Sequence, residues 1–573
     1  MRPFLSIATS LSLLMSLTGN PAMAIEIATP PAATTPIQHI VVIYGENISF
    51  DHYFGTYPVA ANPPGQPRFT AAAGTPTVNG TPGTSNWVNG LTTSLLTNNP
   101  NLNNSGNGSG AANPFRLNRS QALTADMSHS YTPEQNSFDA QSGTYKMDLF
   151  PSKTGSAGGA PNYPLVAVPP AVGTKGLVMG YYDGNTVTAY WNYAQYFAMN
   201  DNSYNSQFGP STPGAVNLVA GNTNAIIASA NGPSSNEVAD GQGGFTLIGD
   251  ADPLGDVCSS TTSFIVQLAG KNVGDLLNSA GLTWGWFQGG FDLTVTNPNG
   301  TTGCKRSTVS PITGNTVADY VQHHEPFQYY ASTQNLSHAR PSSIAAIGTT
   351  DAANHQYDIH DFFDSLNAGN LAAVSFLKAP AYQNGHPGNS NPLDEQAFVT
   401  NVINTLAQSP FWSSTAVIIA YDDSDGWYDH QPGPGIINGS FSTSDTLTGA
   451  NACGIQGTTT QLAGPNSSGL PVNGRCSPGV RTPLLVMSPW AKPNYVDHTF
   501  TIQTSIMRFI EDNWSLGQVG GGSFDGIVGT TVNGVAVGTL NNMFNFTPAL
   551  PPNTVTPILS TITGEVTGTI SVP

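Results

Sequence analysis

The chain has 573 residues, 39% hydrophobic and 9% charged, and this hydrophobic content is enough for a sizeable core, which excludes disorder throughout the chain. A formal net charge of −18 at pH 7 argues against a nucleic-acid partner or an anionic membrane surface, because the protein would repel polyanions. A small anionic substrate fits this charge if a bound cation reverses the field locally.

Residues 1–24 have the pattern of a signal peptide. Arg2 precedes an apolar stretch over residues 11–17, and Ala22-Met23-Ala24 is an A-x-A cleavage pattern. A membrane anchor is the alternative, but the apolar stretch is shorter than the ~20 residues that a spanning helix needs. The sequence therefore predicts a secreted or periplasmic protein with no stable membrane insertion, and residues 25–36 form a short leader.

Apolar runs and helical patterns alternate along the rest of the chain. The strand-length apolar runs cover residues 40–44, 282–287, 372–377, 416–421 and 484–487. The helical patterns cover residues 186–197, 393–409 and 505–514. This alternation predicts an α/β fold, an α/β/α sandwich with a mostly parallel central sheet, in one domain over residues 37–515. Sites in such sheets lie beyond the C-terminal ends of the strands.

Two stretches rich in Asn, Gly, Ser and Thr interrupt this pattern, near residues 79–114 and 435–479. They are predicted as loop insertions that form a lid. Residues 516–573, which are rich in Gly and Thr, are predicted as a C-terminal extension that packs on the domain.

Four cysteines follow the predicted cleavage site, and in an oxidising compartment they predict two disulfides. Of the three possible connectivities, we prefer Cys258–Cys304 with Cys453–Cys476, because these pairs close short loops. The chain contains no C-x-x-C pattern, so the cysteines do not indicate a zinc-thiolate site.

Acidic and amide side chains follow two of the predicted strands. Glu46 and Asn47 come directly after the run at 40–44, and Asp422 and Asp423 come directly after the run at 416–421. Adjacent carboxylates repel each other by about 1 kcal/mol or more where solvent is partly excluded, and a hard divalent cation with oxygen ligands removes that cost. The alternative is an acidic turn that caps a helix, which suits Asp425 or Asp429 better.

Ser211 lies in Phe208-Gly209-Pro210-Ser211-Thr212-Pro213-Gly214, directly before a predicted helix over residues 215–219. A serine at a helix N-terminus sits where backbone N–H groups and the helix dipole favour a phosphate and a lowered hydroxyl pKa. An ordinary helix start is the competing interpretation, because Ser and Thr are preferred N-caps and Pro favours the first turn.

Several histidines stand in short polar motifs: His129, His323, His324, His386 and His430. Imidazolium groups can hold phosphate oxygens or protonate a leaving group. A single histidine is more often structural. Eleven histidines in a chain with only 16 lysines and arginines nevertheless favour phosphate contacts by some of them.

An ordered set of motifs resembles the bacterial phosphoesterase family that joins phosphatidylcholine-type phospholipases C to a group of acid phosphatases. The motifs are IVVIYGENISFDHYFG, DMSHSYTPEQ, GYYDGNTVTAYW, FGPSTPG, HHEPF, GHPG, YDDSDGWYDH and RTPLLVMSPWAKPNYVDH, and they span roughly residues 37–514. The resemblance implies an alkaline-phosphatase-like fold and one divalent metal ion of unspecified identity. The resemblance implies that the metal ligands are Glu46, Asn47, Asp422 and Asp423. It implies that Ser211 is the nucleophile and also contacts the metal. The histidines of the phosphate pocket would be His129, His323, His324 and His386.

Two departures from the family pattern narrow the expected activity. Many members, the phospholipases especially, continue the nucleophile motif as Pro-Asn-Arg, whereas this chain has Pro213-Gly214-Ala215. The strand-end motif, commonly Asp-Glu followed by Gly-Gly, here reads Asp422-Asp423-Ser424-Asp425-Gly426. The first change disfavours a phospholipid head group. We therefore expect a secreted, metal-dependent acid phosphatase that acts on a small phosphate ester. A phospholipase C and an inactive binding protein on the same scaffold are the alternatives.

Overall fold

The computed structural model describes residues 30–81, 94–141, 144–158, 170–434, 445, 472–532, 534–547 and 551–572. The predicted signal peptide and most of the predicted insertion at 435–479 lie outside these residues. Among the described residues, none of the helices combines the length and the apolar character needed to cross a bilayer.

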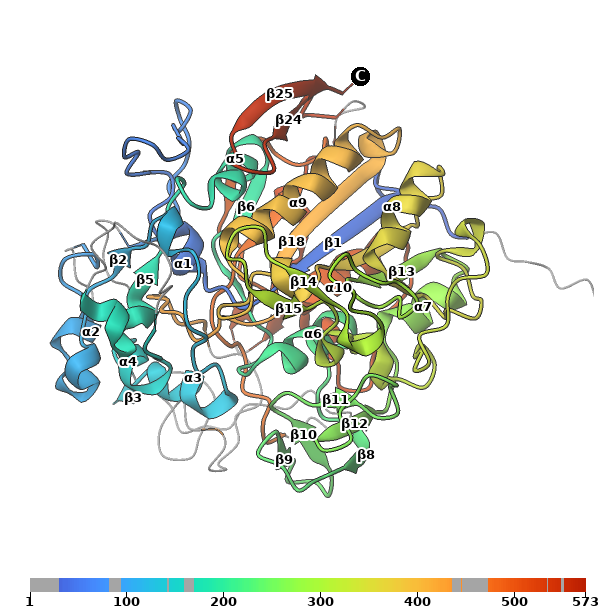
Figure 1. The fold of residues 1–573 in the computed structure, drawn as a ribbon, viewed down its shortest axis with the longest axis horizontal. Coiled ribbons are helices and arrows are strands. Elements are labelled where there is room, and N and C mark those ends of the chain that lie inside the picture. The colour runs from blue at the N-terminus through green and yellow to red at the C-terminus, as the bar shows by residue number, and fades with distance from the viewer. Residues whose placement is uncertain are drawn as a thin grey trace, which may run out of the picture.

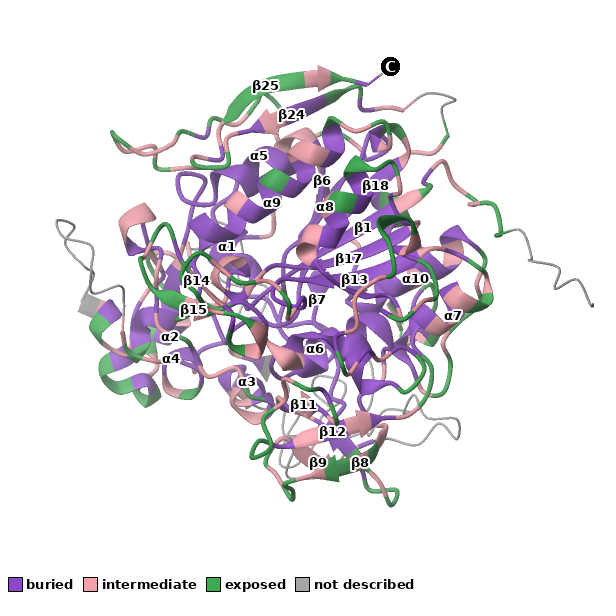
Figure 2. Cartoon of the chain, turned by 45° about the vertical axis from the view of Figure 1, so that its right-hand side comes forward, coloured by how far each residue is buried: buried purple, intermediate pink, exposed green. Residues whose placement is uncertain are grey.

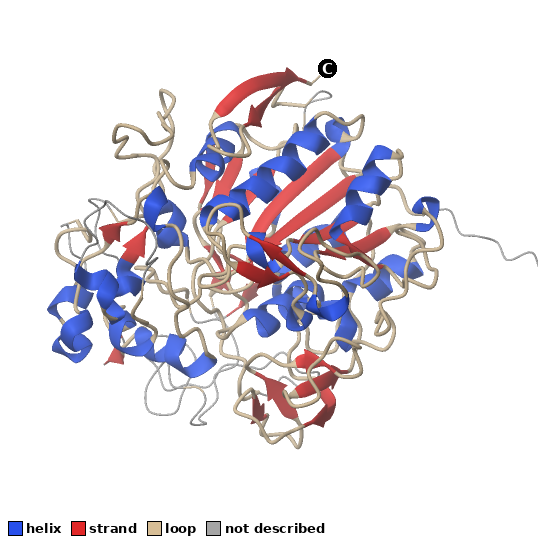
Figure 3. Ribbon diagram, in the orientation of Figure 1, coloured by secondary structure: helices blue, strands red, loops and turns tan. Residues whose placement is uncertain are grey.

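An eight-stranded sheet forms the centre of the molecule (Figures 1 and 3). In spatial order its strands are β16 (Gln356–Asp358), β13 (Trp284–Gln288), β17 (Val374–Lys378), β1 (His39–Gly45), β18 (Thr415–Tyr421), β19 (Leu484–Met487), β6 (Ala198–Asn200) and β20 (Tyr495–Asp497). β19 runs antiparallel to both of its neighbours, and every other pair is parallel. The predicted mostly parallel α/β fold is therefore confirmed.

Strands β1 and β18 explain why the polar motifs meet. Their residues are buried almost throughout, as expected for a parallel strand that is covered on both faces. The parallel register places Gly45 opposite Tyr421, so the residues that follow each strand emerge side by side at the same edge of the sheet. β17 ends at this edge too, because Ile43 pairs with Leu377 and Lys378 is the next residue.

Helices cover both faces of the sheet. The Tyr44 hydroxyl donates to the carbonyl of Gly214 on α6 (Ser211–Val219). The next residue, Gly45, faces the other way, toward Glu395 on α9 (Pro392–Ala407). Because consecutive side chains of a strand point to opposite faces, α6 and α9 lie on opposite sides. α5 (Thr188–Tyr196) packs with α9, and α10 (Thr504–Asn513) packs with α6 (Figure 1).

Smaller elements surround this core. The small sheet of β8 (Ile226–Ala230), β12 (Ile265–Leu268) and β11 (Asp252–Pro253) lies at the bottom of Figure 1, near the hairpin of β9 (Glu237–Ala239) and β10 (Phe245–Leu247). Within the predicted insertion at 79–114, the described residues include α2 (Pro100–Asn103) and a 3-10 helix (Ser105–Gly110).

The C-terminal residues form a hairpin of β24 (Val555–Leu559) and β25 (Val566–Ser571). The hairpin contacts the layer that contains α9: Trp412 Nε1 donates to Thr556 Oγ1 at 2.7 Å, and Asn404 Nδ2 donates to the carbonyl of Leu559 at 2.8 Å. Its outer strand is largely exposed, whereas the central strands are buried (Figure 2).

The disulfide Cys258–Cys304 is present, as predicted. The second predicted pair includes Cys453, which lies outside the described residues.

Candidate active site

Five polar side chains meet beyond the C-terminal ends of β1 and β18. The Ser211 hydroxyl oxygen lies 3.1 Å from Glu46 Oε2, 3.5 Å from Asn47 Oδ1 and 3.1 Å from Asp423 Oδ2. Asp422 joins the group through its Oδ1, which accepts from the backbone N–H of Asn47 at 3.0 Å. All five residues are at most 2% exposed. The structure therefore brings together the five side chains that the sequence singles out as ligands and nucleophile.

Ser211 is the first residue of α6, but its hydroxyl points to the carboxylates rather than to the helix. The N-cap residue is Pro210. The first turn is instead satisfied by Asp250, whose Oδ1 accepts from the backbone N–H of Thr212 at 3.0 Å and from its hydroxyl at 2.9 Å. A carboxylate at this position is also favoured by the helix dipole. The interpretation of Ser211 as an ordinary N-cap does not match this geometry.

Gly214 lets α6 approach the strand-end loop closely. A Cβ atom at this position would lie 2.1 Å from the carbonyl oxygen of Asp422, so that any larger residue would push the helix and the loop apart. The Tyr44 hydroxyl holds the same turn, since it donates to the Gly214 carbonyl at 3.0 Å. The glycine that departs from the family pattern therefore permits the close approach of α6 to the loop that carries Asp422.

Lys378, which the sequence analysis did not single out, lies inside the site. Its ammonium group forms an ion pair with Glu46 Oε1, and it lies 3.2 Å from Asp422 Oδ2. The side chain is fully buried. The sequence feature that could have indicated Lys378 is a single lysine at the end of an apolar run. A lysine in such a position needs a partner, because lysines are almost never fully buried without one.

The electrostatics of the cluster favour an additional cation. Burial raises the pKa of Asp422 to about 6, with a further rise from Glu46, and burial raises the pKa of Asp423 well above its usual value. Burial opposes ionisation of Glu46 too, but the charges of Lys378 and His386 and the hydrogen bonds with Asp422 and Lys378 together outweigh burial, and the pKa of Glu46 is lowered. Three buried carboxylates thus face one lysine. An oxygen-rich, net negative donor set of this kind fits a hard divalent cation.

The predicted pocket histidines form two pairs, of which His323 and His324 are one. His324 Nδ1 lies 2.9 Å from Glu46 Oε1, and the two imidazole ring centres are 4.5 Å apart. Burial, followed by the charges of His323 and Lys378, lowers the pKa of His324 well below its usual value. His324 is therefore a neutral ring that contacts the acidic cluster directly.

His129 and His386 are the other pair, with ring centres 5.9 Å apart. His129 Nδ1 lies 3.2 Å from Asp425 Oδ1 and 2.9 Å from the carbonyl of Met127. Burial lowers the pKa of His129, but the carboxylates of Asp423 and Asp425 raise it by more. The pKa of His129 is therefore well above its usual value. The cationic form of His129 is therefore favoured in the site.

Asp425 links the histidine pair to the ligand cluster. Its Oδ1 accepts from Asn47 Nδ2 at 3.1 Å, and its Oδ2 accepts from the backbone N–H of Met127 at 3.2 Å. The alternative interpretation, in which Asp425 caps a helix, does not match the structure, because Asp425 lies in a turn and no helix follows it. The ligand atoms of one set of residues that includes Asp425 lie within 4.8 Å of one another, so this set could also hold an ion: Asp126, His129, His386 and Asp425.

His430, the remaining histidine motif, lies in a different network. Its Nδ1 is 2.7 Å from Asp51 Oδ2, and Arg481 contacts both Asp51 and Asp429. All four side chains are buried. This network ties α1 (Phe50–Phe54) to the segment that leads into β19, which is a structural role.

Two cavities open beside the cluster and share Asn236 and Asp250 as part of their walls. One, of about 460 Å³, is lined by His129, Ser130, Tyr131, Thr132, Pro133, Pro210, Ser235, Asn236, Ile248, Gly249 and Asp250. The other, of about 400 Å³, is lined by Asn231, Pro233, Ser234, Asn236, Asp250, Ala251, Asp252, Ser263, Phe264 and His323.

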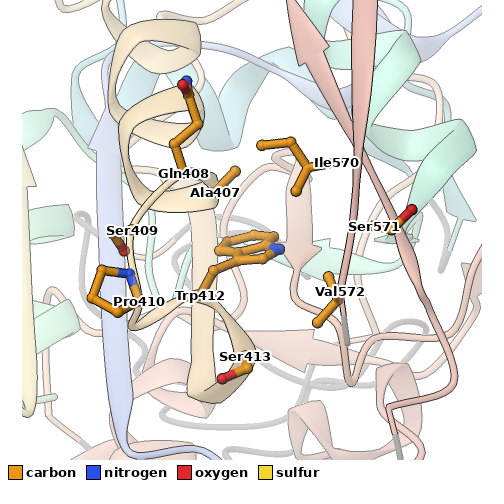
Figure 4. Close-up of a pocket in the computed structure, with 9 residues that line it drawn as sticks. All are labelled: Ala407, Gln408, Ser409, Pro410, Trp412, Ser413, Ile570, Ser571 and Val572. Carbon is orange, nitrogen blue, oxygen red and sulfur yellow. The ribbon is translucent and has the colours of Figure 1, made fainter.

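A further cavity of about 450 Å³ lies far from this chemistry, between the end of α9 and the C-terminal hairpin. Figure 4 shows the Trp412 indole facing Ile570 and Val572 there. The described residues that line it include no carboxylate, histidine, lysine or arginine, so we do not place the active site in it.

Comparisons with known proteins agree with the motifs. A model of the Phosphoesterase family matches residues 37–517. "Non-hemolytic phospholipase C" of Pseudomonas aeruginosa is 31% identical over 153 residues, which is 26% of this chain and 21% of that protein. "Phospholipase C A" of Mycobacterium tuberculosis is 29% identical over 202 residues, or 35% of this chain and 34% of that protein. These two alignments thus span only about a fifth to a third of the relatives' lengths.

A longer alignment joins the chain to "Phospholipase C B" of Mycobacterium tuberculosis. The two are 24% identical over 546 residues, which is 92% of this chain and 81% of that protein. The family match covers most of the chain and contains every motif that builds the acidic cluster and the two histidine pairs. The chain belongs to the Phosphoesterase family.

Proposed function

We propose that this protein is a secreted, metal-dependent phosphomonoesterase of the acid-phosphatase type, with Ser211 as its nucleophile. The observation that carries the proposal is the position of the Ser211 hydroxyl. It is buried at the start of α6, 3.1 Å from both Glu46 and Asp423, while Asp250 satisfies the helix start. A hydroxyl held among carboxylates at a helix N-terminus is placed for attack on a phosphate.

The residues have separate roles in this proposal. Glu46, Asn47, Asp422 and Asp423 would hold the divalent ion, which, when bound, supplies the positive charge that favours the Ser211 alkoxide and neutralises phosphate oxygens. Ser211 gives up its hydroxyl proton to one of the carboxylates that accept from it, Glu46 or Asp423, and Oγ forms a bond to phosphorus as the bond from phosphorus to the ester oxygen breaks. Water then hydrolyses the phosphoserine and releases phosphate.

The histidines complete the proposed mechanism. His129 has its Nδ1 held by Met127 and Asp425, and its raised pKa keeps it protonated, so that Nε2 is the nitrogen that gives a proton to the leaving oxygen. His323, His324 and His386 bind the oxygens of the phosphoryl group.

Two observations favour a monoester over a phospholipid. Gly214 and Ala215 replace the Asn and Arg that many phospholipases of the family have after the nucleophile. The cavities beside the cluster are lined mostly by hydroxyl, amide and carboxylate groups, which suit a small polar alcohol better than acyl chains. The names of the relatives support phospholipase C activity as the second candidate.

Export is supported by the signal-peptide pattern and by the disulfide Cys258–Cys304, because such bonds form and persist in oxidising compartments.

The test is turnover of p-nitrophenyl phosphate and of a short-chain phosphatidylcholine by the purified protein, with and without a chelator and with divalent ions restored. We expect chelator-sensitive cleavage that is faster with the monoester. Rapid release of diacylglycerol with negligible monoester cleavage would make the protein a phospholipase C. No cleavage of either substrate with any divalent ion would indicate an inactive binding protein.

A further inference from the structure

The exposure of the site residues indicates the side from which a substrate can reach Ser211. Glu46, Asn47, Ser211, Asp422 and Asp423 are at most 2% exposed, whereas the side chains of His129 and His323 are 13% and 27% exposed. His129 lines the 460 Å³ cavity and His323 lines the 400 Å³ cavity. An ester whose phosphate lies at Ser211 beside these two histidines would then have its alcohol portion in one or both cavities.

The two cavities are anchored to the helix that carries the nucleophile. Asp250 belongs to both walls, and its Oδ1 holds the backbone N–H and hydroxyl of Thr212, the residue after Ser211. Asn236 is the other shared residue, and its side-chain amide donates to the Asp250 carbonyl. A group that binds between these walls is thus held at a fixed position relative to Ser211.

The lining of the cavities is rich in groups that bind hydroxyls. The side chains that offer such hydrogen bonds are Ser130, Thr132, Ser235, Asn231, Ser234 and Ser263. Among the described residues that line the two cavities there is no lysine or arginine, and the ionisable side chains are Asp250, Asp252, His129 and His323. In the proposed mechanism both histidines act on the phosphoryl group at Ser211, so a second phosphate on the substrate would lack a cationic partner of its own and would face the two carboxylates.

We propose that the substrate is the phosphate monoester of a neutral, polyhydroxylated alcohol, such as a sugar or polyol, whose hydroxyls bind in the cavities beside His129 and His323. This inference rests on the proposed phosphomonoesterase function and adds the class of the leaving group. Sugar bisphosphates, nucleoside polyphosphates and diacylglycerol esters are disfavoured, the first two by charge and the last by the polar walls.

The first experiment compares kcat/KM for glucose 6-phosphate, fructose 1,6-bisphosphate and short-chain phosphatidylcholine, with p-nitrophenyl phosphate as the reference. We expect kcat/KM for glucose 6-phosphate to exceed that for each of the other two substrates by about tenfold or more. A site built to hydrogen-bond hydroxyls disfavours a leaving group that leaves its polar groups unpaired. Equal or better use of the bisphosphate or the phospholipid would overturn the inference.

The second experiment adds a cation to the cavity. Thr132→Lys should raise kcat/KM for fructose 1,6-bisphosphate about fivefold or more, because an ammonium group would now face its second phosphate. The effect is read as the ratio of kcat/KM for fructose 1,6-bisphosphate to kcat/KM for p-nitrophenyl phosphate in the same variant, so that a general change in activity cancels. Ser343→Lys adds the same charge at an exposed residue outside both cavities and should change neither value.

The outcomes separate the two proposals. If p-nitrophenyl phosphate is cleaved but Thr132→Lys leaves the use of the bisphosphate unchanged, the cavities do not hold the leaving group and the inference is overturned, while the phosphomonoesterase function stands. If no phosphomonoester is cleaved with any divalent ion, the proposed function itself fails. A gain on the bisphosphate that is specific to Thr132→Lys supports both.

Discussion

The hydroxyl oxygen of Ser211 lies 3.1 Å from Asp423 Oδ2, although 212 positions separate the two residues in the chain. The contact exists because α6 begins where β18 ends. If Ser211 is the nucleophile, Ser211→Ala should lower kcat by several orders of magnitude and leave the melting temperature and metal content nearly unchanged, since only one hydroxyl is lost. Steady-state kinetics, thermal melting and elemental analysis check this.

Thr212→Ala is the matched control. Its hydroxyl binds Asp250 at the helix start, so its loss should cost stability of about 1 kcal/mol and leave the turnover of the folded protein largely intact. Near-normal turnover in Ser211→Ala, or a much deeper loss of activity in Thr212→Ala, would show that Ser211 is not the attacking group.

The second prediction concerns the metal. Asp422→Ala and Asp423→Ala should each lose the bound divalent ion, because each change removes an anionic ligand from a buried cluster whose repulsion the ion relieves. Elemental analysis of the purified variants measures this. Asp126→Ala is the informative control, since Asp126 belongs to the separate set around His129 and His386. Loss of the ion from Asp126→Ala alone would place it in that set.

The third prediction concerns Lys378. Lys378→Met removes the ammonium group that pairs with Glu46 and Asp422 and leaves these buried carboxylates without a cation in the metal-free protein. Breaking a buried pair in this way costs about 3 kcal/mol or more. The melting temperature of the metal-free variant should therefore fall, and added divalent ion should raise it more than in wild type.

Lys492→Met is the control for Lys378→Met. Lys492 is a partly exposed lysine that lies over the Tyr495 ring, and its loss should not change the response of the melting temperature to metal. A Lys378→Met protein that melts like wild type both with and without metal would contradict the assigned role.

The sequence is informative where local pattern decides the structure. The apolar runs of β1 and β18 could be identified, and the edge at which Glu46 and Asp422 meet follows from parallel pairing. Strand β6 and the edge strand β20 could not be identified, because each has only three residues and is fixed by pairing with its neighbours rather than by its own apolar pattern. The antiparallel direction of β19 likewise depends on tertiary context.

The same distinction applies within the site. Motifs that stand together in the chain, such as His323-His324, were visible as candidates. Lys378 was not, because its role depends on Glu46 and Asp422, which reach it only through the pairing of three strands. Asp250 was missed for a similar reason: it binds Thr212 from a separate small sheet region, and no local pattern indicates that contact.

The last prediction is a pH dependence of stability that arises at Glu511 on α10. Glu511 is 1% exposed. The backbone N–H of Val519 donates to both Glu511 Oε1 and Asp525 Oδ2, so the two carboxyl groups are adjacent. Burial, with a further rise from Asp525, raises the pKa of Glu511 from 4.5 to about 9. Between these values the folded protein binds more protons than the unfolded chain. The free energy of unfolding therefore falls as pH rises through this window, by up to about 1.4 kcal/mol per pH unit.

Glu511→Gln removes this titration and keeps an oxygen to accept from Val519. We expect the melting temperature of Glu511→Gln to exceed that of wild type at pH 8, and we expect this difference to shrink toward pH 5. In wild type the Glu511 carboxyl is neutral in the folded state at both pH values. At pH 8 its ionisation stabilises only the unfolded chain, which lowers the melting temperature of wild type. Asp364→Asn, which neutralises an exposed carboxylate on α8 (Ile359–Asn367), controls for net charge and should show no such trend. Parallel melting curves of wild type and Glu511→Gln across this range would mean that Glu511 titrates in the folded protein as it does in the unfolded chain.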